Sequence, residues 1–388
     1  MRLAIIGFGS RISHVFANLK AVAGDRLQLV GWADVDAKPP GLTRVPEAGR
    51  GFTDHREMLA TLRPDAVMIG SPNHLHLTHI RDALEAGAKV FSEKPVVITP
   101  EESWEAAHLL AKYGQERFLV GLVLRSSPLF RKALATVRSG RIGKPVSMEA
   151  NELLSPEHGG FIARDWRRHR AYSGSHLLEK CCHDIDLHQA LLGGRIVRAA
   201  SFGGRSVFVP ENQTMKTGER YGTWSARWGT DPGGNPFTAE SDIVDHQVFV
   251  AEVEGGARLS FHCNNHVPFG QRRWVLCGVK GAWESDFDNG RIRIQEAFGT
   301  AEVIEPPANG GGHYGADTAM AQDLYDAWFK GTAFPVPTRA AIEAGLAAMG
   351  IDQAQRTGTV FDLTPWWAKL DAILGKPEAA AKSTSATA

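Results

Sequence analysis

The sequence predicts an α/β protein with two parts: an N-terminal doubly wound parallel sheet, then an α/β domain built on a large open, mainly antiparallel sheet. A chain of 388 residues is too long for one compact core, so two domains are expected. Over roughly the first 120 residues, short apolar runs alternate with helical periodicity, which is typical of a parallel sheet covered by helices. Beyond them, strand-like runs follow one another with few helices between, which favours antiparallel pairing.

Composition limits the class of function. The 43 basic and 43 acidic residues give a formal net charge of zero, so no basic field would attract nucleic acid or an anionic membrane. We see no apolar run of about 18 residues that would span a bilayer, and no secretory signal before the first strand. The four cysteines form no C-x-x-C motif, which fits reduced thiols. We therefore expect a cytoplasmic protein that acts on a small molecule.

The first strand is expected at residues 3–6, an apolar run that can be buried on both faces. A glycine turn follows at 7–9, and apolar residues then recur at helical spacing. Strand, glycine turn and helix form the context of a dinucleotide fingerprint, in which a pyrophosphate rests on the helix N-terminus. Ile12 stands where the third glycine of that fingerprint is expected. The residues assigned to the cofactor at this turn are Gly7, Gly9, Ser10, Arg11 and Ile12.

Asp34 follows the second expected strand, residues 27–33. A carboxylate about 20 residues past the glycines is expected to accept hydrogen bonds from the ribose hydroxyls and to repel the 2′-phosphate of NADP. NAD is therefore the expected cofactor and NADP the less favoured one. Asp36 competes for this role, and Arg11 is a cation that could favour a phosphate.

Further elements continue the alternation of strands and helices. Asp54 is expected to cap a helix, Ala66–Ile69 reads as a buried strand, and Thr99 begins a second capped helix. The strand at 89–91 runs into Glu93-Lys94-Pro95, and the last strand of this domain is expected at 117–121. These elements complete the predicted parallel sheet.

Lys94 stands at the carboxyl end of a predicted strand, where open α/β sheets bind ligands. Proline fixes its own φ and restricts the residue before it, so Lys94 is expected to be held in an extended conformation. A surface lysine in a turn is the alternative interpretation.

The second domain begins with a helix near Pro128–Arg138 and ends with an alanine-rich helix at Thr338–Arg356. Residues 376–388 are low in complexity and are expected to be disordered. Strands are expected at Val146–Ala150, Val197–Phe208, Asp245–Glu254, Ala257–His266, Arg273–Cys277 and Arg291–Gln295.

Taken together, these motifs resemble those of the Gfo/Idh/MocA oxidoreductases, the glucose–fructose oxidoreductase, inositol dehydrogenase and rhizopine-catabolism family. The resemblance covers roughly residues 1–365. It implies a Rossmann domain at 1–122, a substrate-binding and oligomerisation domain at 123–375, and a homodimer or homotetramer. The matching segments are Gly7-Phe8-Gly9, Asp34, Ser71-Pro72-Asn73-x-x-His76, Glu93-Lys94-Pro95, Ser173–Asp186 and Gly310–Asp317.

The resemblance also implies the chemistry, a hydride transfer between NAD or NADP and a secondary hydroxyl of a sugar, glycoside or cyclitol. Lys94, Glu179 and His183 are then the catalytic residues. Two departures from the family leave the substrate open: Glu179 stands where aspartate is common, and Lys180-Cys181-Cys182 where small residues are common. Further cofactor contacts are expected from Ser71, Asn73, His76, Glu93, Lys94, Trp166 and Arg167, and substrate contacts from Lys94, Arg125, Glu179, His183 and His313.

Glu179 and His183 are four residues apart, so they share one face of a helix. We expect His183 to accept the proton, oriented by Glu179, while Lys94 hydrogen-bonds the reacting oxygen; the opposite assignment, with Lys94 as the base, stays open. A metal site is an alternative use of this pair, but no third ligand has diagnostic spacing, so no metal is expected.

Two other functions remain in view. Some relatives of this family cleave glycosides through transient oxidation, elimination, water addition and reduction, and the late Gly-Gly-His-Tyr-Gly-Ala-Asp segment keeps such an NAD-dependent glycoside hydrolase as the alternative. A non-catalytic regulator that only binds the cofactor is the other, although intact Lys94, Glu179 and His183 argue against it.

Overall fold

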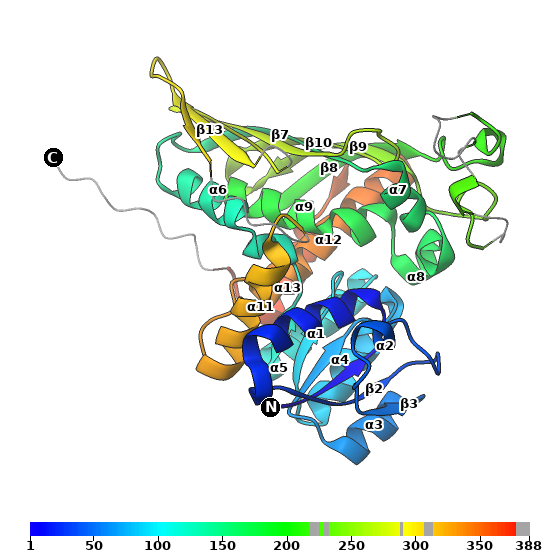
Figure 1. The fold of residues 1–388 in the computed structure, drawn as a ribbon. Helices are drawn as coiled ribbons and strands as arrows, with labels where there is room; N and C mark the ends of the chain where they lie inside the picture. The colour runs from blue at the N-terminus through cyan, green and yellow to red at the C-terminus, as the bar shows by residue number, and fades with distance from the viewer. Residues whose placement is uncertain (217–222, 224–225, 229–232, 288–289, 306–312, 378–388) are drawn as a thin grey trace. The chain divides into compact units, whose positions relative to one another are not determined.

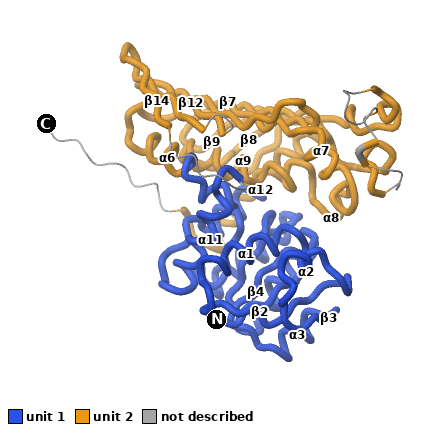
Figure 2. Tube along the Cα trace, in the orientation of Figure 1, with its two compact units in different colours: residues 1–130, 308–346 blue, residues 131–307, 347–388 orange. Residues whose placement is uncertain are grey.

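The structure is a computed structural model that describes residues 1–216, 223, 226–228, 233–287, 290–305 and 313–377. The chain divides into two compact units, residues 1–130 with 308–346 and residues 131–307 with 347–388 (Figure 2). The domain boundaries at 122 and 375 stay predictions. From residue 378 on, the tail expected to be disordered lies outside the described residues.

The first unit is built on a six-stranded sheet in which every pair is parallel (Figure 1). The strand order β3-β2-β1-β4-β5-β6 reverses at β1, which places the topological switch point at the turn that follows this strand. The predicted doubly wound sheet is confirmed. Its strands are β1 (Arg2–Ile6), β2 (Gln28–Ala33), β3 (Arg50–Phe52), β4 (Ala66–Ile69), β5 (Lys89–Ser92) and β6 (Phe118–Val120).

The helices of this unit begin where the sequence places caps. The Asp54 carboxylate accepts the first backbone N–H groups of α3, and Thr99 and Glu102 form a complete capping box at the start of α5. The helical elements are α1 (Ser10–Ala23), η1 (Gly24–Arg26), α2 (Gly41–Arg44), α3 (His55–Leu62), η2 (Asn73–Leu75), α4 (His76–Glu85), α5 (Pro100–Tyr113), η3 (Val123–Ser126), α11 (Ala316–Tyr325) and η8 (Asp326–Lys330).

A late segment returns to the first unit. Helix α11 packs against α1 and η3, and Ser126 Oγ donates to Asp323 Oδ2 at 2.5 Å. Further on, the backbone N–H of Thr338 donates to Gln115 Oε1 at 2.6 Å. These contacts join the first unit to residues that lie some 200 positions later in the sequence.

The second unit contains a nine-stranded sheet of order β14-β13-β12-β11-β7-β10-β9-β8-β15. All of its pairs are antiparallel except β7 with β10, so the mainly antiparallel sheet is confirmed. Strands β12, β14 and β15 were not predicted from the sequence. The strands are β7 (Pro145–Leu153), β8 (Ile196–Gly204), β9 (His246–Val253), β10 (Arg258–Asn264), β11 (Gln271–Gly278), β12 (Gly281–Asp286), β13 (Arg291–Glu296), β14 (Glu302–Ile304) and β15 (Phe361–Asp362).

Helix α9 lies against one face of this sheet, and no described helix covers the other (Figure 1). On the covered face, buried Trp274 stacks on Trp283 and its Nε1–H donates to His188 Nε2 at 3.2 Å. The other helical elements, of which α6 and α12 contain residues of both units, are α6 (Pro128–Arg138), α7 (Pro156–Ile162), η4 (Asp165–Arg168), α8 (Arg170–Ser173), α9 (His176–Leu192), η5 (Pro210–Asn212), η6 (Ala226–Trp228), η7 (Glu254–Gly256), α12 (Thr338–Thr357) and α13 (Thr364–Leu374).

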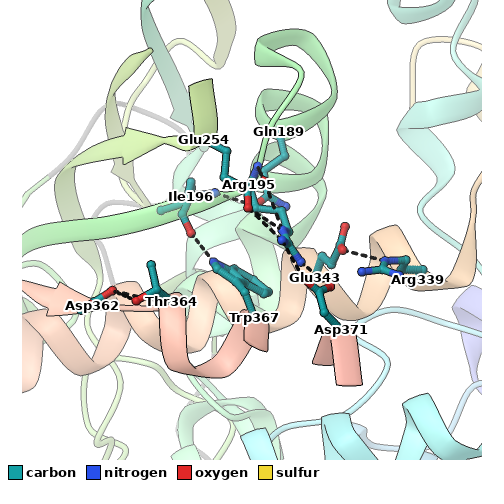
Figure 3. A network of polar contacts seen from close by, with 10 residues as sticks. All are labelled: Gln189, Arg195, Ile196, Glu254, Arg339, Glu343, Asp362, Thr364, Trp367 and Asp371. Carbon is teal, nitrogen blue, oxygen red and sulfur yellow. Dashed lines mark hydrogen bonds and ion pairs between the residues drawn. The ribbon is translucent and has the colours of Figure 1, made fainter. Parts of the chain in front are cut away.

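A polar network anchors α13 beside the start of β8 (Figure 3). The Arg195 guanidinium donates to both oxygens of Glu254 and to the Asp371 carboxylate, with distances of 2.8 to 3.2 Å. The Trp367 indole N–H donates to Ile196 O at 2.8 Å. None of the described helices is long and apolar enough to cross a membrane.

Candidate functional site

The glycine turn after β1 has room for a ligand. Gly7 has φ of 74°, and a Cβ there would lie 2.3 Å from Ser71 N, so only glycine fits. A Cβ at Gly9 would meet no atom within 4 Å, which leaves open space in front of the turn. The next residue begins α1, whose first turn contains no acidic side chain. These features fit a pyrophosphate resting on the N-terminus of α1.

Ile12 occupies the position of the missing third glycine without loss of close packing. Its side chain is fully buried, and a Cβ added to Gly70 would lie 2.5 Å from Ile12 Cβ. The third glycine of the fingerprint serves close contact between helix and strand. Here the strand side of that contact supplies the glycine instead.

Asp34 is held by backbone groups at the end of β2. Its Oδ2 accepts the Phe8 N–H at 2.7 Å, and its Oδ1 accepts the Asp36 N–H at 3.0 Å. The carboxylate is therefore fixed beside the glycine turn, as a receptor for ribose hydroxyls requires.

Arg11 joins three segments of the first unit. Its Nε donates to Glu93 Oε1 at 2.9 Å and its Nη1 to Asp317 Oδ1 at 2.6 Å, while His313 Nδ1 lies 2.9 Å from Asp317 Oδ2. Burial disfavours charge on this guanidinium, yet the two carboxylates raise the pKa of Arg11. Burial also works against the charge of Asp317, but His313 and Arg11 hold the pKa of Asp317 well below its usual range. With two carboxylate partners, Arg11 is a poor receptor for a phosphate.

His76 ties the loop after β4 to the loop that carries Lys94. The ring is 1% exposed, with Nδ1 2.7 Å from Pro95 O and Nε2 2.9 Å from Ser71 O. The backbone N–H of Lys94 donates to Glu93 Oε2 at 3.3 Å, and the Lys94-Pro95 peptide bond is cis. His76 thus joins the two loops from a buried position.

In the second unit, Glu179 and His183 occupy neighbouring turns of α9 and are 8% and 6% exposed. Ser175 caps this helix by accepting the Leu178 N–H. Arg167 Nε donates to Glu179 Oε1 at 3.3 Å and orients that carboxylate. The arrangement is a buried carboxylate and an imidazole on one helix face, which is suited to moving a proton.

The Arg167 guanidinium is itself held between two rings, 4.2 Å from the Phe161 centroid and 4.4 Å from that of Trp166. Such stacking fixes a guanidinium plane while leaving its edge available for hydrogen bonds. The predicted residues Trp166, Arg167 and Glu179 therefore belong to one cluster.

Both halves of the chain match known sequences. Residues 1–122 match the oxidoreductase family with an NAD-binding Rossmann fold, and residues 130–284 match the GFO/IDH/MocA C-terminal domain. The chain belongs to the Gfo/Idh/MocA family. The resemblance found in its motifs is thereby confirmed, and with it an NAD-binding Rossmann domain in the first unit.

Relatives of this Gfo/Idh/MocA chain include oxidoreductase YteT of Bacillus subtilis, 24% identical, with 83% of this chain and 88% of the relative aligned. The scyllo-inositol 2-dehydrogenase (NAD(+)) of the same organism is 29% identical, with 73% and 72% aligned. Among solved structures, levoglucosan dehydrogenase in complex with NADH and levoglucosan has a TM-score of 0.75 at 17% identity, covering 94% of this chain and 99% of that one. At that identity the likeness shows the fold.

The residues predicted for the Gfo/Idh/MocA site divide between the two units. Trp166, Arg167, Glu179 and His183 lie in the second unit. Gly310–Gly312 lie outside the described residues. The predicted residues in the first unit are Gly7, Gly9, Ser10, Arg11, Ile12, Asp34, Ser71, Asn73, His76, Glu93, Lys94, Arg125 and His313.

The sequence analysis missed several polar residues beside those it named. His79 is buried with Nδ1 2.9 Å from Ser71 Oγ, and burial, with neighbouring His55, lowers the pKa of His79 to about 3. In the second unit it missed Glu152 and Arg272, which are buried next to α9. Their signal was a charged residue on the inward face of a strand. Among the described residues, no group of three or more His, Cys, Asp and Glu side chains is arranged to hold a metal.

Proposed function

We propose that the protein is an NAD-dependent dehydrogenase that oxidises a secondary hydroxyl of a sugar, glycoside or cyclitol, or reduces the corresponding ketone. The observation that carries this proposal is the buried Glu179–His183 pair on α9, in a chain whose first unit is an NAD-binding Rossmann domain. Support for the substrate class comes from relatives named scyllo-inositol 2-dehydrogenase and inositol 2-dehydrogenase, and from the fold shared with levoglucosan dehydrogenase.

The first unit holds the cofactor. Gly7 and Gly9 let the pyrophosphate approach α1, and Asp34 accepts the ribose hydroxyls. When bound, NAD takes up the hydride that leaves the alcohol carbon. Asp34 also disfavours the 2′-phosphate of NADP, and Arg11 is neutralised by its two carboxylate partners. NAD is therefore the preferred form.

The proton of the hydroxyl passes to His183, because imidazole is the side chain that most often accepts and releases a proton in general acid–base catalysis. Glu179, fixed by Arg167, orients the imidazole or binds a neighbouring substrate hydroxyl. Lys94 donates a hydrogen bond to the reacting oxygen and stabilises its developing charge. Arg125 and His313 complete the set assigned to the substrate.

The proton acceptor can be identified from pH–rate profiles. With His183 as the base, His183→Ala loses about 100-fold or more in kcat and the limb of kcat/KM that reports the base. Lys94→Ala also loses turnover but keeps that limb. The reverse pattern would make Lys94 the base, and unaltered turnover in His183→Ala would exclude the assignment.

The glycoside hydrolase alternative finds no support in the described residues. The segment that raised it is in part outside them, and its Asp317 is already engaged by Arg11 and His313. Release of an aglycone in the substrate assay would support the hydrolase instead.

The exposed sheet face is the surface we assign to self-association into a homodimer or homotetramer. Phe202 is 70% exposed, and Val248 and Val250 on the neighbouring strand are also exposed. Exposed apolar side chains gathered on one sheet face are typical of an interface. Light scattering on the purified protein measures its oligomeric state and checks this assignment.

The free cysteines fit a reducing, cytoplasmic setting.

The decisive experiment is to purify the protein and identify the nicotinamide it retains by mass spectrometry. NAD is then offered with myo-inositol, scyllo-inositol, levoglucosan and methyl β-D-glucoside, with absorbance of reduced nicotinamide as the signal. We expect reduction with at least one of these and weaker activity with NADP. Tight NAD binding without turnover across the panel would refute the dehydrogenase, and aglycone release without net NADH would establish the hydrolase.

A further inference from the structure

Four charged side chains of alternating sign meet between α9 and the sheet of the second unit; three are buried, and the Lys180 side chain is 13% exposed. Lys180 Nζ lies 3.0 Å from Glu152 Oε1. Arg272 Nε lies 2.7 Å from Glu152 Oε2 and 2.8 Å from Asp184 Oδ1. Glu152 and Arg272 are direct partners on β7 and β11, and Lys180 and Asp184 are four residues apart on α9. We call these four residues the charge quartet.

Removing the charge quartet from water costs free energy. Asp184 is 0% exposed, Glu152 3% and Arg272 4%, and one carboxylate oxygen of Asp184 has no hydrogen-bond partner among the described residues. Burial raises the pKa of both carboxyls, while Arg272 and then Lys180 oppose the rise. Replacing such groups by apolar side chains of similar volume is often neutral or stabilising. Stability alone therefore does not explain the quartet.

The positions of Lys180 and Asp184 on α9 indicate a role for the charge quartet. Lys180 and Asp184 each follow one residue after Glu179 and His183, so the two pairs point about 100° apart around the same helix axis. An apolar helix face tolerates small shifts along a sheet, since dispersion contacts are not directional. A shift of one residue would move Lys180 and Asp184 by about 1.5 Å and 100°, separating both from their partners.

We propose that the charge quartet fixes the rotation and axial position of α9, and that Lys180 and Asp184 are thereby positioning residues for Glu179 and His183. This inference rests on the proposed function, because it concerns the geometry of that proton-handling pair. It assigns to buried charges the register role that they are known to have in other helical assemblies.

Three variants separate positioning from stability. Lys180→Met keeps the length of the side chain and removes its charge, and Lys180→Arg restores the charge. The double variant Lys180→Met/Glu152→Gln removes both partners, so no unpaired carboxylate is left buried beside Arg272. Arg195→Met is the matched control, since Arg195 also bridges two carboxylates, Glu254 and Asp371 (Figure 3), and lies beyond the end of α9 at Leu192.

For Lys180→Met we expect kcat to fall about 10- to 100-fold with the KM for NAD unchanged, because small misplacements of a catalytic group cost that much. Lys180→Arg recovers most of the loss. The double variant recovers the unfolding midpoint but not kcat, since the charges that define the position are still missing. Arg195→Met lowers the midpoint and changes kcat by less than about twofold.

A purely structural quartet gives a different pattern. In that case kcat and the unfolding midpoint fall together in Lys180→Met and recover together in the double variant, and the proposal is refuted. It is equally refuted if kcat of Lys180→Met stays within about twofold of the unmodified protein.

Hydrogen exchange tests the proposal without any turnover. We expect the amides of His176–Leu192 to exchange at least about tenfold faster in the double variant, and not in Arg195→Met. Unchanged exchange in α9 overturns the inference even if the protein is an active dehydrogenase. If exchange in α9 is faster but the protein oxidises none of the four compounds in the substrate panel, the proposed function is overturned and the positioning of α9 is established.

Discussion

The buried imidazole of His188 makes the second unit sensitive to acid. His188 lies on α9, is 0% exposed and accepts the Trp274 indole N–H. Burial, reinforced by the charge of Arg272, lowers the pKa of His188 to about 3. In His188→Gln the amide oxygen can still accept that N–H, but the side chain no longer titrates. The substitution therefore removes a proton-linked contribution while leaving an acceptor for Trp274.

The direction in which stability changes with pH follows from proton binding. Unfolded histidine has a pKa of about 6.5, so below that pH the unfolded chain binds a proton at position 188 that the folded protein excludes. Stability is fully present above pH 6.5 and falls as the pH drops towards about 3. At pH 5 the gap is about 1.5 units, or about 2 kcal/mol at 1.36 kcal/mol per unit. His188→Gln does not lose this amount.

Urea unfolding at pH 8 and pH 5, followed by tryptophan fluorescence, measures the effect. Trp274 and Trp283 are buried in the same unit and report its unfolding. We expect His188→Gln to be less stable than the unmodified protein at pH 8, and the difference to shrink by about 2 kcal/mol at pH 5. Exposed His262→Gln is the control and should show no such change. An equal difference at both pH values would refute the argument.

Three further substitutions test the first unit. Asp34→Ser should raise the ratio of kcat/KM for NADP over NAD by about tenfold or more, because a carboxylate no longer repels the 2′-phosphate. His76→Gln should lower kcat about tenfold and the unfolding midpoint, since a glutamine amide cannot span Ser71 O and Pro95 O, which the two ring nitrogens of His76 contact. Asp317→Asn should destabilise the unit at pH 7 by about 2 kcal/mol. That difference should begin to shrink as the pH falls below about 4, because the unfolded chain then takes up a proton at position 317 while the depressed pKa of Asp317 keeps the folded carboxylate charged; urea unfolding at pH 7 and 3 measures the decrease.

Local signals were enough to predict the parallel sheet and its turn. The caps at Asp54 and Thr99 act within a few residues of themselves, so the sequence displays them directly. The contact between Arg11 and Asp317 joins residues 306 apart. No periodicity reports such a pairing, which is why the return of residues 308–346 to the first unit was not predicted.

The charge quartet was not predicted, because strands were recognised by their hydrophobic pattern. The strand expected at residues 146–150 continues to Leu153 in the structure, and the one expected from 273 begins at Gln271. Each prediction stopped short of a buried charged residue, Glu152 in one strand and Arg272 in the other. A hydrophobic pattern treats an inward charge as the end of a strand, so it fails where charges are paired across the sheet.

Burial of the proton-handling pair bears on whether the protein is a catalyst or only a sensor of NAD. In the proposed function, the cofactor is bound by the glycine turn and Asp34, which belong to the first unit. A sensor has no need of a carboxylate and an imidazole on α9 that are each less than 10% exposed, because removing such groups from water costs free energy. Arg167 donates to Glu179 and thereby orients this carboxylate inside the unit. Positions of this kind are expected where a proton has to move, and they favour the dehydrogenase over a binding protein.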